Sequence, residues 1–216
     1  RFRVLRYDPR GHGASSVPAR PWDVGALGRD VLGLLDALGI GEASFCGLSL
    51  GGMVGMWLGV NAPRRLRRLV LANTAAWLGP PERWDARIAT VEAGGMAAVA
   101  EGVLSRWFTP AFRAARPDEV ERLRGILVAT PPRGYAAASA AIRDMDQRSA
   151  VAGIRAPTLV VAGASDEATP PADARFLAER IAGARLVELE AAHLSNVEAA
   201  APFTRAVAGF LSGEEG

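Results

Sequence analysis

The segment Gly47-Leu48-Ser49-Leu50-Gly51 places a serine in the pattern G-x-S-x-G. An apolar stretch typical of a strand, 43–48, precedes the serine, and an apolar stretch typical of a helix, 53–62, follows it. A sharp turn between strand and helix would hold the hydroxyl above the edge of a sheet, and small flanking residues let the two elements approach. This context predicts that Ser49 is a nucleophile.

A serine hydroxyl needs a base to become a good nucleophile, and the chain has two histidines, His12 and His193. His193 follows a predicted strand, 186–189, and precedes the last predicted helix. Residues that follow parallel strands converge at one edge of a doubly wound sheet, so we expect His193 beside Ser49. His12 lies in Arg10-Gly11-His12-Gly13, which favours a turn residue held by local hydrogen bonds.

The base in turn needs an acid that fixes its tautomer and stabilises the imidazolium. Asp166 follows the predicted strand 158–162, and one helix and one strand separate it from His193. The resulting chain order is Ser, Asp, His. Asn73, at the equivalent position after strand 69–72, carries no charge. Two rival acids fall in a region of predicted helices: Asp144 and Asp146.

Apolar periodicity predicts the elements that would position these residues. Strands are expected at 1–7, 43–48, 69–72, 158–162 and 186–189, and helices at 23–38, 53–62, 171–181 and 197–211. Strands that alternate with helices predict a parallel sheet covered on both faces.

Residues 74–152 differ, because only helices are predicted there: 83–92, 97–107, 118–127 and 135–144. Proline and glycine pairs separate them. The chain is therefore predicted to be an α/β protein in which residues 1–73 and 153–216 form the core and residues 74–152 form a helical cap.

The composition excludes several classes of protein. Half of the residues are hydrophobic and the net charge is +2, which is typical of a folded domain rather than a disordered chain. The basic residues are all arginines, spread along the chain without a nucleic-acid-binding motif. No run of 18 apolar residues predicts a membrane span. We therefore expect neither nucleic acid nor membrane as a partner. Cys46 is the single cysteine, so we expect a reducing, cytoplasmic location.

Short stretches along residues 1–211 resemble those of one enzyme family. They are Tyr7-Asp8-Pro9-Arg10-Gly11-His12-Gly13, 47–53, 69–76, Arg106-Trp107-Phe108-Thr109-Pro110, 129–132, 141–146 and Ala191-Ala192-His193-Leu194-Ser195-Asn196-Val197-Glu198. Through them the chain resembles the α/β hydrolases, and more narrowly the 3-oxoadipate enol-lactonases of the β-ketoadipate pathway. The resemblance also implies further strands and a His-Gly oxyanion loop upstream of Arg1.

The resemblance implies that an enol-lactone bearing an acetate side chain is hydrolysed to 3-oxoadipate, in the protocatechuate and catechol branches of aromatic catabolism. Ser49 would attack the ring carbonyl, His193 would take its proton and Asp166 would steady the imidazolium. The backbone N–H of Leu50 would be one donor of the oxyanion hole. No metal and no organic cofactor is expected.

An anionic lactone or ester is thus the expected partner, and its carboxylate needs a cation from the cap. Arg106 and Arg143 are the candidates, because a guanidinium can bind a carboxylate through two hydrogen bonds. Trp107 is the candidate for an apolar wall. Substituting Arg143 by Ala is then expected to raise KM more for the anionic lactone than for a neutral aryl ester.

Other activities remain compatible with these residues. A carboxylesterase, a C–C bond hydrolase or a perhydrolase of the same fold would carry the same three side chains. A non-catalytic binding module of this fold is a further alternative, and a fluorophosphonate probe that labels Ser49 would distinguish it from an enzyme.

Overall fold

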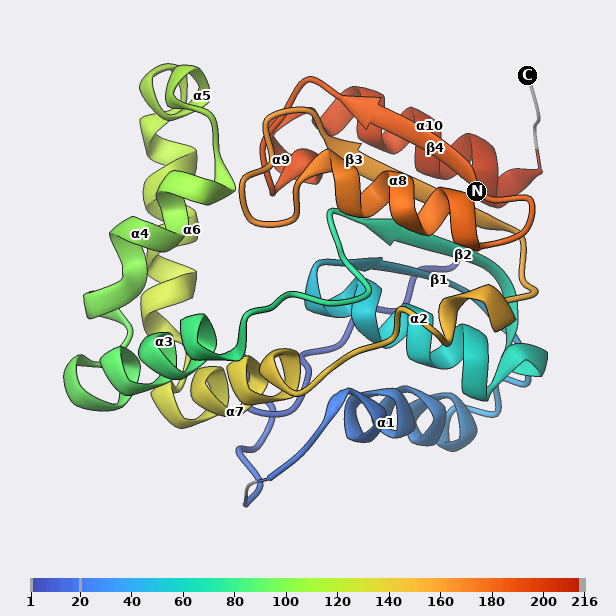
Figure 1. The fold of residues 1–216 in the computed structure, drawn as a ribbon, viewed down its shortest axis with the longest axis horizontal. Coiled ribbons are helices and arrows are strands. Elements are labelled where there is room, and N and C mark those ends of the chain that lie inside the picture. The colour runs from blue at the N-terminus through green and yellow to red at the C-terminus, as the bar shows by residue number, and fades with distance from the viewer. Residues whose placement is uncertain (1, 20, 214–216) are drawn as a thin grey trace.

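Four apolar segments of the chain pair side by side in a parallel sheet with the order β1-β2-β3-β4 (Figure 1). The computed structural model describes residues 2–19 and 21–213. The strands are β1 (Ala43–Leu48), β2 (Leu66–Ala72), β3 (Thr158–Gly163) and β4 (Arg185–Leu189). Because all four strands run in the same direction, the loops after their carboxyl ends meet at one edge of the sheet.

Both faces of the sheet are buried at its two central strands, which explains why β2 and β3 are apolar along most of their length. Leu69 and Leu71 pack into a core with α1, α2 and α8, whereas Val70 and Ala72 pack on the opposite face with Phe210 of α10. The helices beside the sheet are α1 (Val24–Ala37), α2 (Leu50–Asn61), α8 (Pro171–Arg180), α9 (Ser195–Glu198) and α10 (Ala200–Ser212), with 3-10 turns η1 (Pro63–Arg65) and η2 (Val151–Gly153).

Between β2 and β3 the chain forms five helices that lie together beside the carboxyl edge of the sheet (Figure 1). These cap helices are α3 (Pro81–Gly94), α4 (Ala97–Trp107), α5 (Pro110–Ala115), α6 (Pro117–Ala129) and α7 (Pro132–Arg143). Four of them begin with proline, whose fixed φ suits the first helical position. In the described chain, no helix combines the length and the apolar character that a bilayer crossing needs.

Most predicted elements are confirmed. The strand 43–48 and the helix 97–107 have the predicted bounds. The helix 23–38 is confirmed as α1, and Asp23 caps it by accepting a hydrogen bond from the Ala26 N–H at 2.6 Å. The short helix α5 was not predicted.

Two predicted elements are wrong. Residues 2–9 form no strand, and Val4 is 73% exposed, because no described strand lies beside them to pair with; Arg1 lies outside the described residues. The predicted helix 197–211 is divided into α9 and α10 at Ala199. Pro202 accounts for this break, because it has no N–H to donate to the Glu198 carbonyl and its ring would clash with that group.

Candidate active site

Ser49 sits at the sharp turn between β1 and α2. Its backbone has φ 55° and ψ −117°, and a positive φ is a conformation that serine rarely adopts. Hydrogen bonds hold this turn: the Ser49 N–H donates to the Ala72 carbonyl at 2.9 Å, and the Thr74 hydroxyl donates to the Ser49 carbonyl at 2.7 Å. Serine is a favoured helix N-cap, yet this one makes no capping hydrogen bond. Its hydroxyl is therefore left for the pocket.

Close approach of strand and helix at this turn depends on Gly47. A Cβ added to Gly47 would lie 2.1 Å from the carbonyl oxygen of Gly51, which is backbone and cannot move aside. A Cβ on Gly51 would meet nothing within 4 Å. The turn therefore requires a glycine at position 47, where any side chain would clash. At position 51 only the backbone takes part in the contact, so a side chain could be accommodated there.

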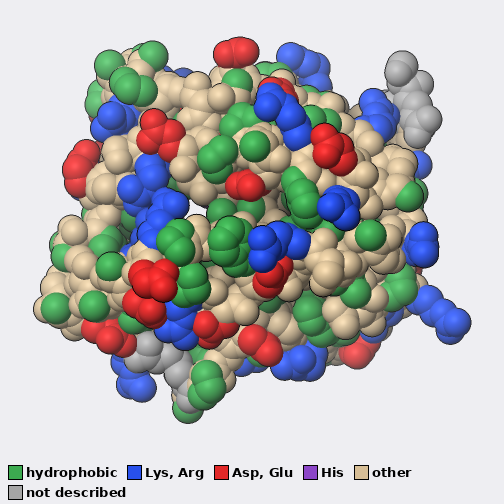
Figure 2. Space-filling view, viewed as in Figure 1, with side chains coloured by type: hydrophobic (Ala, Val, Ile, Leu, Met, Phe, Trp, Pro, Cys, Tyr) green, Lys and Arg blue, Asp and Glu red, His purple; other side chains and the backbone are tan. Residues whose placement is uncertain are grey.

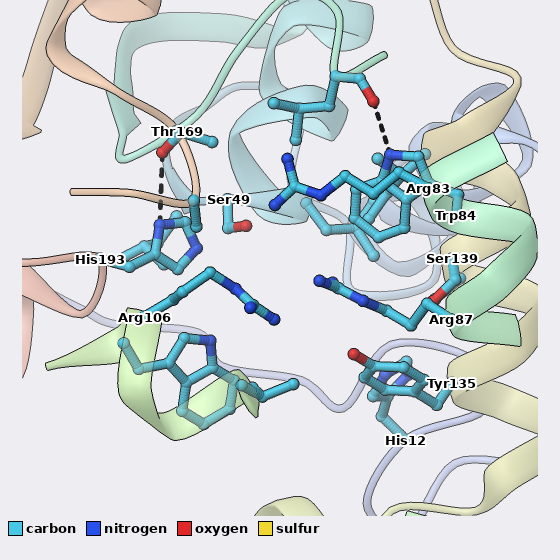
Figure 3. Close-up of a pocket in the computed structure, with 18 residues that line it drawn as sticks. His12, Ser49, Arg83, Trp84, Arg87, Arg106, Tyr135, Ser139, Thr169 and His193 are labelled. Carbon is cyan, nitrogen blue, oxygen red and sulfur yellow. Dashed lines mark hydrogen bonds between the residues drawn. The ribbon is translucent and has the colours of Figure 1, made fainter. Parts of the chain in front are cut away.

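His193 and Asp166 are brought together as the sequence predicts. The His193 Nδ1 lies 2.9 Å from the Asp166 Oδ2, and the two residues are 4% and 3% exposed. Because this bond places the imidazole proton on Nδ1, Nε2 is the nitrogen that remains as a base. Ser49 and His193 line the same pocket, and Figure 3 shows the serine hydroxyl beside the imidazole ring.

The Asp166 carboxylate has a full set of hydrogen-bond donors. The N–H groups of Ala168 and Thr169 donate to Oδ1 at 2.8 and 3.0 Å, while the Thr169 hydroxyl and the Asn73 amide donate to Oδ2 at 2.7 and 2.9 Å. Burial would raise the pKa of Asp166, but the hydrogen bond and charge of His193, with the Thr169 and Asn73 bonds, outweigh it and lower the pKa. The acid is thus held as a carboxylate.

The loops that carry the acid and the base are joined through their backbones. The Ala164 and Ser165 N–H groups donate to the carbonyls of Leu189 and Ala191 at 2.8 and 3.0 Å. A Cβ added to Gly163 would lie 2.2 Å from the Ala192 carbonyl oxygen, so a glycine at the end of β3 permits this approach. The relative position of Asp166 and His193 is therefore set by the main chain.

A cavity of about 230 Å³ lies between this edge of the sheet and the cap helices. Ser49, Leu50 and His193 line it on the side of the sheet, and Leu50 is the first residue of α2. A helix begins with N–H groups that have no partner within the helix, so the Leu50 N–H is suited to stabilise negative charge formed at Ser49.

Of the predicted cap residues, Arg106 and Trp107 line this cavity, and Arg143 does not. The Arg143 guanidinium instead pairs with Asp85 at 2.6 Å and Asp144 at 2.7 Å. The structure therefore corrects the expectation for Arg143, because two carboxylates hold its charge outside the pocket. Asp146, the other rival acid, pairs with an arginine as well, Arg148, at 2.5 Å.

Arg83 and Arg87 of α3 occupy the pocket in addition, and sequence reasoning missed them. Residues four apart lie on the same side of a helix, so their spacing was the available signal. Tyr135 was missed as well, and it carries a hydroxyl into the same space (Figure 3). Burial, followed by the positive charges of Arg87 and Arg83, lowers the pKa of Arg106.

His12 combines the predicted role with a second one. Its Nδ1 lies 3.2 Å from the Arg10 carbonyl, which is the local contact expected in a turn. It also lines the pocket, next to Tyr135 (Figure 3). Backbone contact explains this: a Cβ on Gly134 would lie 1.9 Å from the Gly11 carbonyl oxygen, so the turn sits directly against the start of α7.

Comparison with known proteins agrees with this geometry. Residues 1–200 match the family described as alpha/beta hydrolase fold. The chain is 43% identical to 3-oxoadipate enol-lactonase 2 of Acinetobacter baylyi, over 96% of this chain and 78% of that protein. A crystal structure of the enol-lactonase from Burkholderia xenovorans LB400 is 46% identical, with a TM-score of 0.96 over 98% of this chain and 81% of that one.

A crystal structure of a hydrolase from Pseudomonas aeruginosa PA01 is similar as well, with 55% identity and a TM-score of 0.94 over 97% of this chain and 80% of that one. These similarities extend through the cap helices as well as the sheet. The chain therefore belongs to the α/β-hydrolase family and, within it, is related to the 3-oxoadipate enol-lactonases over nearly its whole length.

Proposed function

We propose that this protein is a serine hydrolase that opens 3-oxoadipate enol-lactone to 3-oxoadipate. The observation that carries the proposal is the buried pair of Asp166 and His193, which lines one pocket together with Ser49 and arginines of the cap. The identity to named enol-lactonases supports the choice of substrate. In this proposal, residues 74–152 act as the cap over a core made of residues 1–73 and 153–216.

In the first half of the reaction, the Ser49 Oγ attacks the ring carbonyl and its proton passes to His193 Nε2. Asp166, already a carboxylate, stabilises the imidazolium that forms. The Leu50 N–H donates to the developing oxyanion. The ring C–O bond then breaks, which leaves an acyl group on Ser49 and an enol oxygen at the other end of the same molecule.

The leaving group makes this step easier than ester cleavage with an alkoxide. An enolate is the weaker base, so it leaves more readily. It takes the proton of the His193 imidazolium, and the enol that forms tautomerises to the ketone. In the second half, His193 takes a proton from the water that attacks the acyl carbon. It returns this proton to the Ser49 Oγ as the acyl bond breaks, which releases 3-oxoadipate with a new carboxylate. The side chains named here and water suffice for both halves.

Arg106 and Trp107 provide the contacts for the rest of the substrate. The Arg106 guanidinium can hold the acetate carboxylate through two hydrogen bonds, and the indole of Trp107 can cover the apolar side of the ring. We place the reaction in the cytoplasm, within aromatic catabolism, as the function of the relatives and the single Cys46 favour.

A comparison of two substrates tests the proposal. We expect kcat/KM for the enol-lactone to exceed that for a neutral aryl ester by about tenfold or more, because one guanidinium–carboxylate contact strengthens binding by about that factor. Substituting Arg106 by Gln is expected to raise KM for the lactone and leave the neutral ester nearly unchanged. Arg122→Gln, on the exposed face of α6, is the matched control.

Equal or better turnover of the neutral ester would contradict the lactonase assignment and favour a general carboxylesterase. Cleavage of a C–C bond in a vinylogous diketone in preference to the lactone would favour a C–C hydrolase. If Ser49 fails to react with a fluorophosphonate, the protein is a binding module rather than an enzyme.

A further inference from the structure

Three guanidinium groups line one cavity, from Arg83, Arg87 and Arg106. Arg87 and Arg106 are half-buried, and Arg83 lies at the exposed mouth. Figure 3 shows Arg106 reaching in from the side of His193 and the other two from α3 opposite. In the space-filling view, arginines gather at the hollow between the cap helices and the rest of the fold (Figure 2).

Several other arginines of the cap form ion pairs, whereas these three have no acidic partner among the described residues. Arg143, Arg122 and Arg124 each form an ion pair at 2.5–2.7 Å. Within the described residues, no carboxylate lies within ion-pair distance of the three pocket arginines. Glu167 acts on Arg106 electrostatically but does not pair with it.

The arrangement is held in place by neighbours rather than by counter-charges. The Arg87 guanidinium lies over the ring of Trp84, 4.8 Å from its centroid, and the Trp84 indole N–H donates to the Leu78 carbonyl at 2.6 Å. Burial, and then the repulsion from Arg87 and Arg83, lower the pKa of Arg106. Like charges gathered in a partly desolvated pocket are unfavourable unless a ligand supplies negative charge.

The charge in this pocket exceeds what the substrate of the proposed function can neutralise. The enol-lactone carries one carboxylate, whereas its hydrolysis product carries two. The new carboxylate forms at Ser49, and the original one is the acetate carboxylate that Arg106 holds in the proposed function, so Arg83 and Arg87 are left for the new one. A linear dianion thus matches cations placed on both sides, and a monoanion does not.

We propose that the pocket is a receptor for linear six-carbon dicarboxylates, with Arg106 holding the acetate carboxylate, as in the proposed function, and Arg83 and Arg87 holding the new carboxylate formed at Ser49. The proposal rests on the proposed function, because 3-oxoadipate is such a dianion. It implies that the product binds more tightly than the substrate. Dicarboxylates of this length therefore inhibit the enzyme by competing for the pocket.

Calorimetric titration with adipate tests this, because adipate has the length and charge of the product and is not hydrolysed. At fixed ionic strength we expect adipate to bind about tenfold or more tightly than hexanoate, the monoanion of equal length. Succinate is too short to reach both walls and should bind like the monoanion. Sulfate controls for general attraction of anions to arginine.

Variants assign the effect to the named side chains. The double substitution Arg83→Gln with Arg87→Gln should weaken adipate binding about tenfold or more and change hexanoate binding far less. Arg122→Gln, an arginine of the cap that is paired with Glu119, should bind adipate like the wild type. Thermal unfolding confirms that each variant folds, and if the double variant does not, the four-ligand series on the wild type still decides.

Equal affinity for adipate and hexanoate would overturn the proposal, as would binding of sulfate as tight as that of adipate, which means an adventitious ion only. The proposed function is judged separately, by turnover of the lactone. If the protein hydrolyses the lactone but binds adipate no better than hexanoate, this inference alone is wrong. If it prefers adipate but does not hydrolyse the lactone, the proposed function alone is wrong.

Discussion

The side-chain amide of Asn73 donates a hydrogen bond of 2.9 Å to Asp166 Oδ2, the same oxygen that lies 2.9 Å from His193 Nδ1. Asn73 follows β2 and Asp166 follows β3, so two neighbouring strand ends share one carboxylate. The neutral residue after β2 thus supports the acid after β3. Its φ of 43° suits asparagine, which adopts the left-handed region more readily than most residues.

Replacing Asn73 by Ala should therefore weaken catalysis without weakening substrate binding. The loss of a hydrogen bond to a buried carboxylate costs about 1.5–3 kcal/mol, so we expect kcat to fall by about tenfold or more and KM to change little. The pKa of Asp166 should rise, which moves the acidic limb of the pH–rate profile to higher pH. A profile that keeps its acidic limb would contradict the role given to Asn73.

Gln147→Ala is the matched control for that experiment. Gln147 is also a buried amide, and its Nε2 donates to the Met53 carbonyl at 3.0 Å. Its removal should lower the melting temperature while the pH–rate profile stays in place, because no hydrogen bond from Gln147 reaches Asp166.

The two glycines of the serine motif should respond differently to alanine. Gly47→Ala forces a Cβ against the Gly51 backbone and should destabilise the fold by about 1–3 kcal/mol or more. Gly51→Ala meets open space and should be neutral or stabilise α2 by up to about 1 kcal/mol. Thermal unfolding of the two variants tests this. Equal melting temperatures for Gly47→Ala and Gly51→Ala would mean that the strand and the helix do not approach each other as closely as described.

Asp173, in the first turn of α8, should make the stability of the protein depend on pH. Burial, and then the negative charge of Asp166, raise the pKa of Asp173 from 3.8 to about 6. The folded state thus binds this proton more tightly than the unfolded state, so stability is lost as pH rises from about 4 to about 6. Asp173→Asn should raise the melting temperature at pH 8 and have little effect below pH 4.

Asp118→Asn serves as the control, because Asp118 lies in the first turn of α6 and is exposed. It loses only a favourable interaction with the helix dipole, so its melting temperature should fall slightly or not change at pH 8. A gain at pH 8 for both variants would mean that burial beside Asp166 is not the cause.

Glu198 joins the histidine loop to the cap helices and should position both. Its carboxylate accepts from the Ala192 N–H at 2.9 Å, next to His193, and from the hydroxyl and N–H of Thr109, which precedes α5. Glu198→Ala should lower kcat and the melting temperature together. Glu198→Gln should recover most of both, since its amide can accept from Ala192 and donate to the Thr109 hydroxyl.

The surface pair of Glu119 and Arg122 provides the comparison for Glu198. Glu119→Ala should change the melting temperature little, because a surface ion pair contributes little to stability, and should leave kcat unchanged. If Glu198→Ala changes the melting temperature and kcat as little as Glu119→Ala does, the bonds from Glu198 to the histidine loop and the cap do not contribute to catalysis.

The three side chains proposed for catalysis could be located from sequence because each follows a short strand, and the carboxyl ends of parallel strands meet at one edge. Their support could not be located in this way. The bond from Asn73 to Asp166 joins loops 93 residues apart, and no local pattern reports it. Proline at 202 did carry a local signal, and it divides the last helix as its missing N–H requires.

Which arginines of the cap face the pocket could not be predicted from sequence, because it depends on how the cap helices pack against one another. Arg143 lies next to Asp144 and opposite Asp85 of α3, and this second carboxylate comes from a different helix. Arg83 and Arg87 share one side of α3, but only the packing of α3 against the rest of the cap places that side toward Ser49.

Reaction with a fluorophosphonate, followed by peptide mass spectrometry and lactone turnover, tests the central claim most directly. We predict a single adduct on the peptide that contains Ser49, absent from Ser49→Ala, and a loss of lactone turnover in that variant by about 10⁴-fold or more. An adduct on another residue, or a Ser49→Ala protein that still opens the lactone at a comparable rate, would contradict it.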